Sequence, residues 1–284
     1  MEANKTNPIL VPYDFTDISD TALFHAAHIA QLKNLPLILL NIFEKSTQNF
    51  LNKHKGKTLN EYMENICEKY SKEFDIKVGF IIKKEKVLLV SETAKELNIS
   101  YMFIGIDQSH TAASKLLRML GNSPAPVYVV HENVEWRDIK TIVFPVDSFK
   151  ETIQKTSCAI KIAKHTNATI RLFSITLKDS NLQTIQEKRV KQIQQLLTDN
   201  GVNFITDFAS RDEKNFPDEL SDYAKKNNAD LFILMKTPKK FLANILTNPV
   251  DIKFLFNSQN TPSIYVNRNN TSLYEISWLP VIAR

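Results

Sequence analysis

The chain has 284 residues, of which 43% are hydrophobic and 24% charged. This composition is that of an ordinary soluble globular protein and excludes a disordered chain, and the length exceeds the common size of a single domain. The polar start of the chain and its short apolar runs predict neither a secretory signal nor a membrane segment, so we expect a cytoplasmic protein.

The charge pattern and the cysteine content exclude further classes of function. The net charge is +5, but the lysines alternate with acidic residues along the expected helices, which is typical of a solvated surface. We therefore expect neither a nucleic-acid partner nor a membrane partner. Cys67 and Cys158 do not have the spacing of a metal site or of a disulfide framework, so no metal is expected either.

The first elements predict an α/β fold. Residues 9–12 form a short apolar strand, and Asp14, Thr16 and Asp17 follow as residues that commonly start helices. Alanines at near-helical spacing then predict a helix that can lie close to a sheet. Residues 37–43 form a continuous apolar strand, as in parallel sheets. In the rest of this half we expect one amphipathic crossover helix over 51–74. We also expect strands at 76–82, 101–106 and 127–130, and helices at 87–97 and 114–120.

The second half repeats the first. Asp147 follows Asp14 at an offset of 133 residues, and each has a proline two positions before it. The expected strands are 141–146, 169–176, 203–207, 231–235 and 263–267, and the expected helices are 151–165, 182–200, 217–227 and 250–257. This order predicts two tandem doubly wound, Rossmann-like domains, 1–137 and 138–267, each with a five-stranded parallel sheet, followed by a tail, 268–284.

The last strands and the tail predict how the halves assemble. The linker 132–140 is short, so the two domains must pack side by side. Since an open apolar edge invites aggregation, we predict that strands 127–130 and 263–266 pack together as an internal pseudo-dimer, and a homodimer or an unknown protein partner could add to it. The apolar tail around Trp278 is expected to dock on the groove between the domains or on a second chain; the alternative is a frayed terminus.

The strand ends predict where a ligand would bind. In an open parallel sheet, ligands bind beyond the carboxyl ends of the strands, where the strand order reverses. Asp14 and Asp147 stand at such ends, and a carboxylate there can accept a hydrogen bond from the amine or the ribose of an adenosine. The alternative is structural, since Asp14 or Thr16 could simply cap the next helix.

The strand-Pro-x-Asp-helix opening, the alanine-striped helix and the closing apolar strand, all present twice, resemble the universal stress protein family in its tandem two-domain form. The resemblance covers residues 7–267. It implies a binding module of the stress response that holds ATP through the aspartate, through main chain after the second strand, and through a glycine-rich phosphate loop after the fourth. The candidate nucleotide-binding residues are Asp14, Asn41, Gly105 and Ser114 in the first domain, with Asp147 as a vestige in the second.

The chain departs from the family's phosphate loop in both halves. Only 5 glycines are present; Gly105 and Ser114 keep part of the loop, but Gln108 replaces its second glycine. In the second half Met235 replaces the first glycine, and Pro238 has no N–H for a phosphate. The sequence therefore predicts degenerate pockets with no dedicated catalytic site and no certain cofactor. The alternatives are an ATP or AMP sensor or weak ATPase that uses the first domain, and a purely structural pseudo-dimer.

Overall fold

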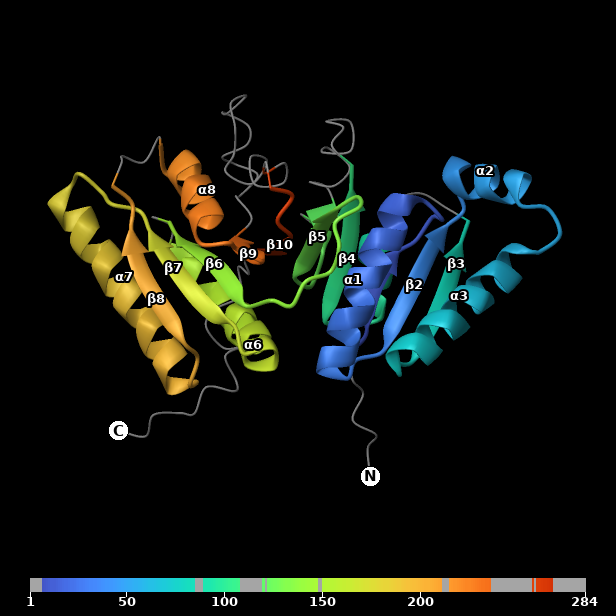
Figure 1. The fold of residues 1–284 in the computed structure, drawn as a ribbon, viewed down its shortest axis with the longest axis horizontal. Helices are drawn as coiled ribbons and strands as arrows, with labels where there is room; N and C mark the ends of the chain where they lie inside the picture. Colours follow the sequence, from blue (N-terminus) through green and yellow to red (C-terminus); the bar gives the residue numbers. More distant parts are fainter. Residues whose placement is uncertain are drawn as a thin grey trace.

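The ten strands of the described residues form one continuous sheet (Figure 1). The computed structural model describes residues 7–84, 89–107, 119–120, 122–147, 150–210, 215–235, 257 and 259–267. The strands are β1 (Ile9–Pro12), β2 (Leu37–Ile42), β3 (Val78–Lys83), β4 (Tyr101–Ile106), β5 (Val127–His131), β6 (Thr141–Val146), β7 (Thr169–Ser174), β8 (Phe204–Phe208), β9 (Leu231–Met235) and β10 (Ser263–Val266). Their order across the sheet is β3-β2-β1-β4-β5-β10-β9-β6-β7-β8.

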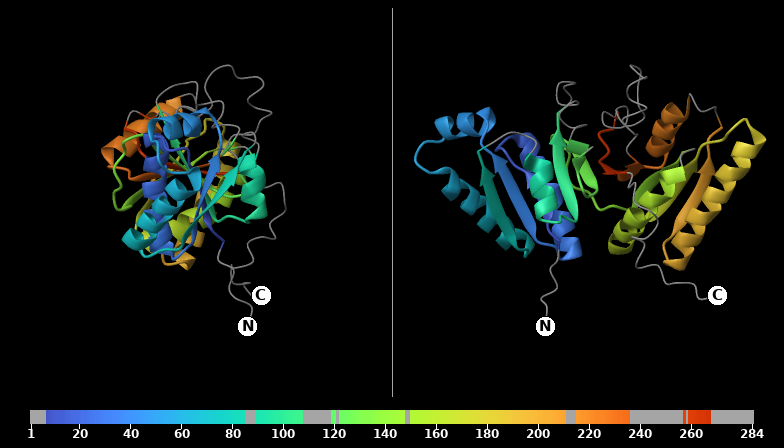
Figure 2. Two further views of the ribbon diagram at one scale, coloured as in Figure 1. Left: turned by 90° about the vertical axis from the view of Figure 1, so that its right-hand side faces the viewer. Right: turned by 180° about the vertical axis from the view of Figure 1, so that it is seen from behind.

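Helices cover both faces of this sheet (Figure 2). They are α1 (Asp17–Lys33), α2 (Lys45–Lys53), α3 (Leu59–Phe74), α4 (Leu89–Glu96), the 3₁₀ helix η1 (Lys150–Lys155), α6 (Thr156–Thr166), α7 (Ser180–Asp199) and α8 (Phe216–Lys226). One hydrophobic core lies between the sheet and α1, α3, α6 and α7, and the other lies under α4 and α8. Side chains alternate between the two cores along each strand: Ile9 and Val11 enter the first core and Leu10 the second.

The two halves repeat one topology, as the sequence predicts. Within each half all strands are parallel, and the order β3-β2-β1-β4-β5 corresponds to β8-β7-β6-β9-β10. Reversal of strand order beside β1 and β6 makes each half a doubly wound α/β unit. The fold class is confirmed.

The halves are joined by antiparallel pairing of β5 with β10, in which Ser263 lies opposite Val129 and Tyr265 opposite Val127. The prediction that the closing strands pack together is therefore confirmed. The pairing also removes both apolar edges from solvent, since Tyr128, Val129, Ile264 and Tyr265 are almost completely buried.

The expected single helix over 51–74 is wrong. Instead α2 ends at Lys53, a loop follows, and α3 begins at Leu59. The chain turns at Gly56, whose φ of +115° is a conformation that residues with a side chain rarely adopt. A new helix then starts at Thr58, whose hydroxyl accepts a hydrogen bond from the Glu61 N–H while the Glu61 carboxylate accepts one from the Thr58 N–H.

Several predictions fall outside the described residues. These are most of the helix expected at 114–120, nearly all of the helix expected at 250–257, and the tail 268–284 with Trp278. Ser114, Gln108 and Pro238 lie outside them as well.

Candidate functional site

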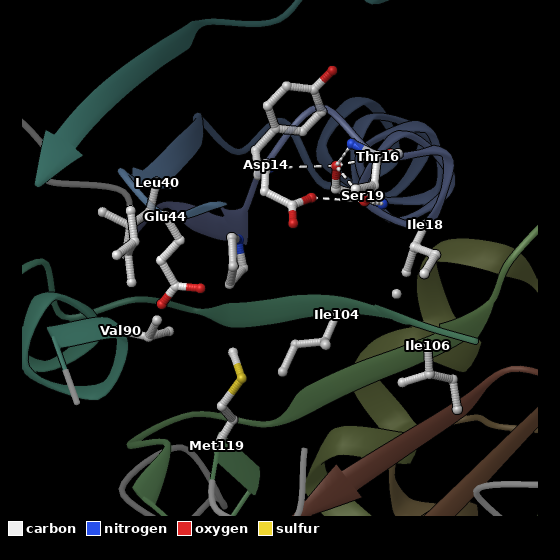
Figure 3. Close-up of a pocket in the computed structure, with 14 residues that line it drawn as sticks. Asp14, Thr16, Ile18, Ser19, Leu40, Glu44, Val90, Ile104, Ile106 and Met119 are labelled. Carbon is white, nitrogen blue, oxygen red and sulfur yellow. Dashed lines mark hydrogen bonds between the residues drawn. The ribbon is translucent and has the colours of Figure 1, made fainter. Parts of the chain in front are cut away.

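A cavity of about 220 Å³ opens at the carboxyl ends of β1, β2 and β4 in the first half (Figure 3). This is the end of the sheet at which ligands bind in open parallel folds. Its apolar floor comes mainly from the strands and from Val90 and Met119, and its polar rim comes from the segment after β1 and from Glu44. The lining residues are Pro12, Tyr13, Asp14, Thr16, Ile18, Ser19, Leu40, Ile42, Glu44, Val90, Ile104, Gly105, Ile106 and Met119.

Asp14 projects its carboxylate into this cavity (Figure 3). The Thr16 hydroxyl donates a hydrogen bond of 2.6 Å to Asp14 Oδ1 and so fixes the rotamer. The following residue, Phe15, has a φ of +64°, which is rare for a bulky side chain and marks a strained turn. Phe15 is held there by stacking on Phe50, with 4.2 Å between the ring centroids. The turn therefore keeps Asp14 at the cavity rim.

The structure shows that Asp14 does not cap α1, which was the alternative that the sequence left open. Thr16 is the N-cap of α1: its hydroxyl accepts a hydrogen bond from the Ser19 N–H, and the Ser19 hydroxyl accepts one from the Thr16 N–H. This reciprocal pair satisfies the start of the helix without Asp14. The Asp14 carboxylate is thus available to the cavity.

Gly105 also lines the cavity, but helix packing alone requires a glycine there. A Cβ atom built on Gly105 would lie 2.1 Å from the Ile18 carbonyl oxygen and 2.7 Å from Ile18 Cγ2. No side chain fits such a gap, so Gly105 is what allows the first turn of α1 to touch β4.

Asn41 lies outside the cavity. The side chain is completely buried and faces away from the cavity-lining Leu40 and Ile42, because successive residues of a strand point to opposite faces. Asn41 Nδ2 donates hydrogen bonds to the Tyr13 carbonyl oxygen at 2.8 Å and to Thr47 Oγ1 at 3.0 Å. These contacts attach α2 and the end of β1 to β2, so the structure gives the Asn41 side chain a bracing role.

The side chains of Tyr13 and Asp20 tie the segment after β1 to α1. The Tyr13 hydroxyl donates a hydrogen bond of 2.5 Å to Asp20 Oδ1. Burial raises the pKa of Tyr13 and also that of the Asp20 carboxyl. The Tyr13 hydroxyl therefore stays protonated and serves as a fixed donor to Asp20.

Sequence reasoning missed Glu44 as a member of the site. Figure 3 shows the Glu44 side chain pointing toward the cavity from the segment after β2. The signal was available, since an acidic residue two positions beyond a buried strand stands at the carboxyl end of the sheet, as Asp14 does.

The corresponding place in the second half is built differently. Strand register places Met235, with its side chain, where the first half has Gly105. The close approach of helix to strand seen at Ile18 is excluded there, and the chain after Asp147 winds first as the 3₁₀ helix η1. Thr152 donates a hydrogen bond to Asp147 Oδ1, and Arg189 donates one to the Asp147 carbonyl oxygen.

A buried lysine further distinguishes the second half. Lys155, at the position of Ala22 in the first half, is completely buried. Its ammonium group donates a hydrogen bond of 2.6 Å to the Pro145 carbonyl oxygen and lies 4.5 Å from the centre of the Phe144 ring. Pro145 corresponds to Pro12, which lines the cavity of the first half. The amino group of Lys155 therefore lies at the strand end that is equivalent to the cavity wall of the first half.

None of the His, Cys, Asp and Glu side chains of the described residues come together in a group of three or more that could hold a metal ion. None of the helices in this part of the chain is both long and apolar enough to cross a membrane.

The fold is a doubly wound α/β arrangement in two halves, with a cavity at the carboxyl ends of the strands of the first half. Residues 5–131 match the model of the universal stress protein family. No curated protein matches the sequence.

Solved structures extend the likeness to both halves. A universal stress protein from Archaeoglobus fulgidus DSM 4304 has a TM-score of 0.69 at 13% identity, over 93% of this chain and 99% of its own. A functionally unknown protein from Pseudomonas aeruginosa PAO1 has a TM-score of 0.59 at 14% identity, over 93% of each chain. At such identities these similarities show the fold and nothing beyond it.

Proposed function

We propose that this chain works by binding, as a tandem universal-stress-protein module whose small-molecule site lies in the first domain, 1–137. The second domain, 138–267, is a diverged copy, and 268–284 is a tail. The proposal depends chiefly on Asp14: Thr16 fixes one carboxylate oxygen, and within the part of the chain that the structure describes the other accepts no hydrogen bond. An acceptor held at a cavity rim in this way is suited to a ligand N–H or O–H.

The ligand class that fits best is an adenine nucleoside or nucleotide. The apolar floor suits the faces of a base, and Asp14 suits an exocyclic amine or a ribose hydroxyl. The cavity of about 220 Å³ is below the usual range for whole drug-sized ligands. We therefore expect it to hold the base or the sugar of a nucleotide, with the phosphates outside it. Because helix packing already explains Gly105, this glycine does not by itself support a phosphate cradle.

Binding is favoured over catalysis by the chemistry of the lining. The described lining residues include no His, Cys, Lys or Arg, so they offer carboxylates and hydroxyls but no cation to stabilise a developing negative charge. A weak ATPase would need such a group from elsewhere. We propose that the protein has no dedicated catalytic site.

Titration calorimetry on the full chain with ATP, AMP and adenosine tests this proposal. Asp14→Asn removes the charge and preserves the shape, so we expect it to weaken binding by tenfold or more, about 1.4 kcal/mol or above. Asp147→Asn is the matched control, because it makes the same change at the equivalent strand end, and it should leave affinity unchanged. Equal losses in the two variants, or a site lost only in Asp147→Asn, would contradict the assignment to the first half.

The purely structural pseudo-dimer gives a different result. In that case none of the three compounds would raise the melting temperature, because only a ligand that binds the native state stabilises it. Native mass spectrometry of the purified chain would report any co-purified nucleotide and would also reveal a homodimer or a bound protein partner.

A further inference from the structure

A cavity of about 330 Å³, called here the junction cavity, lies where the two halves of the chain meet. Its walls are residues 133–137 of the linker, residues 229–230 before β9 and residues 259–262 before β10. The almost completely buried side chains of His25, from α1, and Tyr128, from β5, also line it. Both halves therefore contribute to this cavity, whose volume is in the range of small-molecule sites.

The hydrogen bonds of His25 determine what the Tyr128 hydroxyl can do. His25 Nε2 lies 2.9 Å from the Val134 carbonyl oxygen, which can only accept, so Nε2 carries the hydrogen. Burial lowers the pKa of His25 to about 4, so at physiological pH the ring is neutral and Nδ1 has a lone pair. The Tyr128 hydroxyl, 3.4 Å from Nδ1, therefore donates to it. The Tyr128 oxygen keeps lone pairs that can accept a hydrogen bond from a ligand.

Asp230 adds a charged acceptor close to this hydroxyl. Asp230 Oδ2 accepts hydrogen bonds from the Lys140 N–H at 2.9 Å and from the Thr141 N–H at 2.8 Å. Within the described residues the other oxygen, Oδ1, accepts none. Burial raises the pKa of Tyr128, and the nearby negative charge of Asp230 raises it further. A carboxylate and a hydroxyl oxygen in one cavity suit the ammonium group of a ligand.

The other charged residues of the lining are Arg137 and Glu135, which are exposed side chains of the linker. In the part of the chain that the structure describes, neither of them forms an ion pair. A guanidinium group can bind a carboxylate through two parallel hydrogen bonds. The lining therefore offers acceptors for a positive group on Asp230 and Tyr128, and a cation for a negative group on Arg137.

The internal repeat shows that the fold alone does not require these groups. A cavity of about 500 Å³ lies at the opposite end of the β5–β10 pairing, in the place that the repeat makes equivalent. By strand register, Ser100 in that cavity corresponds to Asp230. Ile264 of β10 corresponds to Tyr128 of β5. Asp230 and Tyr128 are thus particular to the junction cavity.

We propose that the junction cavity binds a free amino acid, with its ammonium group between Asp230 and Tyr128 and its carboxylate on Arg137. The ligand would carry one group of each sign, as the lining does. The amides of Asn133 and Gln259 also line the cavity and can hydrogen-bond to a polar side chain of the ligand.

A thermal-shift screen of the full chain with each of the standard amino acids in turn tests this proposal. We expect a saturable rise in melting temperature with at least one of them, and saturable binding of that compound in calorimetry. The amide of that amino acid lacks the carboxylate, and its N-acetyl derivative lacks the ammonium group. Each derivative should therefore bind roughly tenfold more weakly or worse. The proposal is overturned if no amino acid binds saturably, or if either derivative binds equally well.

Variants of the cavity lining locate the site. Asp230→Asn and Arg137→Gln should each weaken the binding by roughly tenfold or more, because each removes the charge that faces one end of the ligand. Asp230→Asn keeps an oxygen for the N–H groups of Lys140 and Thr141, so the variant should fold, and circular dichroism would verify this. Tyr128→Phe should weaken the binding by about fivefold, because it removes one acceptor.

Asp138→Asn is the matched control, because it makes the same change of charge in the same linker but does not line the cavity. The proposal is overturned if the binding survives in Asp230→Asn/Arg137→Gln, or if it falls equally in Asp138→Asn. The junction cavity shares no lining residue with the Asp14 cavity, so this inference is independent of the proposed function. Asp14→Asn should therefore leave the binding of the amino acid unchanged.

Discussion

Gly105→Ala should destabilise the protein through one steric contact. The added Cβ would lie 2.1 Å from the Ile18 carbonyl oxygen, whereas real contacts of this kind are not closer than 3.0 Å, so α1 and β4 must separate by roughly 1 Å. The obstructing atom belongs to the backbone of a helix and cannot rotate away. Overpacking of a well-packed site costs about 1–3 kcal/mol, and we expect a loss near the upper end, about 3 kcal/mol.

Gly79→Ala is the matched control for this prediction. Gly79 belongs to β3, and a Cβ there would meet nothing within 4 Å. Alanine should be neutral or stabilise by about 0.5 kcal/mol, because it reduces the entropy of the unfolded chain. Urea denaturation followed by circular dichroism measures both free energies of unfolding. If the two variants have equal stability, the contact between α1 and β4 is not as close as described.

Three further predictions concern other parts of the chain. Burial lowers the pKa of His25 to about 4, below the unfolded value of 6.5, so the stability contributed by the neutral ring is complete above pH 6.5 and is lost as the pH falls toward 4. Going from about pH 7.5 to about pH 5 should cost about 2 kcal/mol through this residue, and an unchanged pH dependence of urea denaturation in His25→Gln would contradict this. Asn41→Ala should lower the free energy of unfolding by about 2 kcal/mol, because two buried hydrogen bonds are lost, and should leave the nucleotide affinity in calorimetry unchanged. Weaker nucleotide binding in this variant would show that Asn41 belongs to the binding site. Removal of residues 272–284 should lower the melting temperature or shift the oligomer on a sizing column, because we expect this apolar segment to be docked and not exposed to water. A variant that is unchanged in both measurements would show that the tail does not dock.

The sequence was sufficient to predict the architecture because two independent signals agree. Apolar runs of strand length alternate with helical periodicity, and the whole pattern occurs twice. The error at 51–74 has a local cause: the apolar periodicity continues past a glycine whose left-handed conformation is visible only in the structure.

The site was predictable by position and less so by side-chain direction. Asp14 follows from the rule that ligands bind at carboxyl strand ends, and Gly105 follows from the resemblance to the family's phosphate loop; both line the cavity. Asn41 was included for its place in the chain, but a shift of one residue along a strand reverses the face. Lys155 could not be anticipated, because a lysine within a helix usually reaches solvent, and only the packing shows this one enclosed.

The covalent joining of the two halves has a consequence for how the protein can change. In a symmetric dimer of identical chains every substitution appears twice, so a glycine required at one strand end is required at both. Here Met235 could replace the second copy of that glycine, and Lys155 could fill the neighbouring core, while Gly105 and Ala22 stayed in the first half. One half can therefore lose the close contact between helix and strand without removing it from the other, while the β5–β10 pairing holds both in a single sheet.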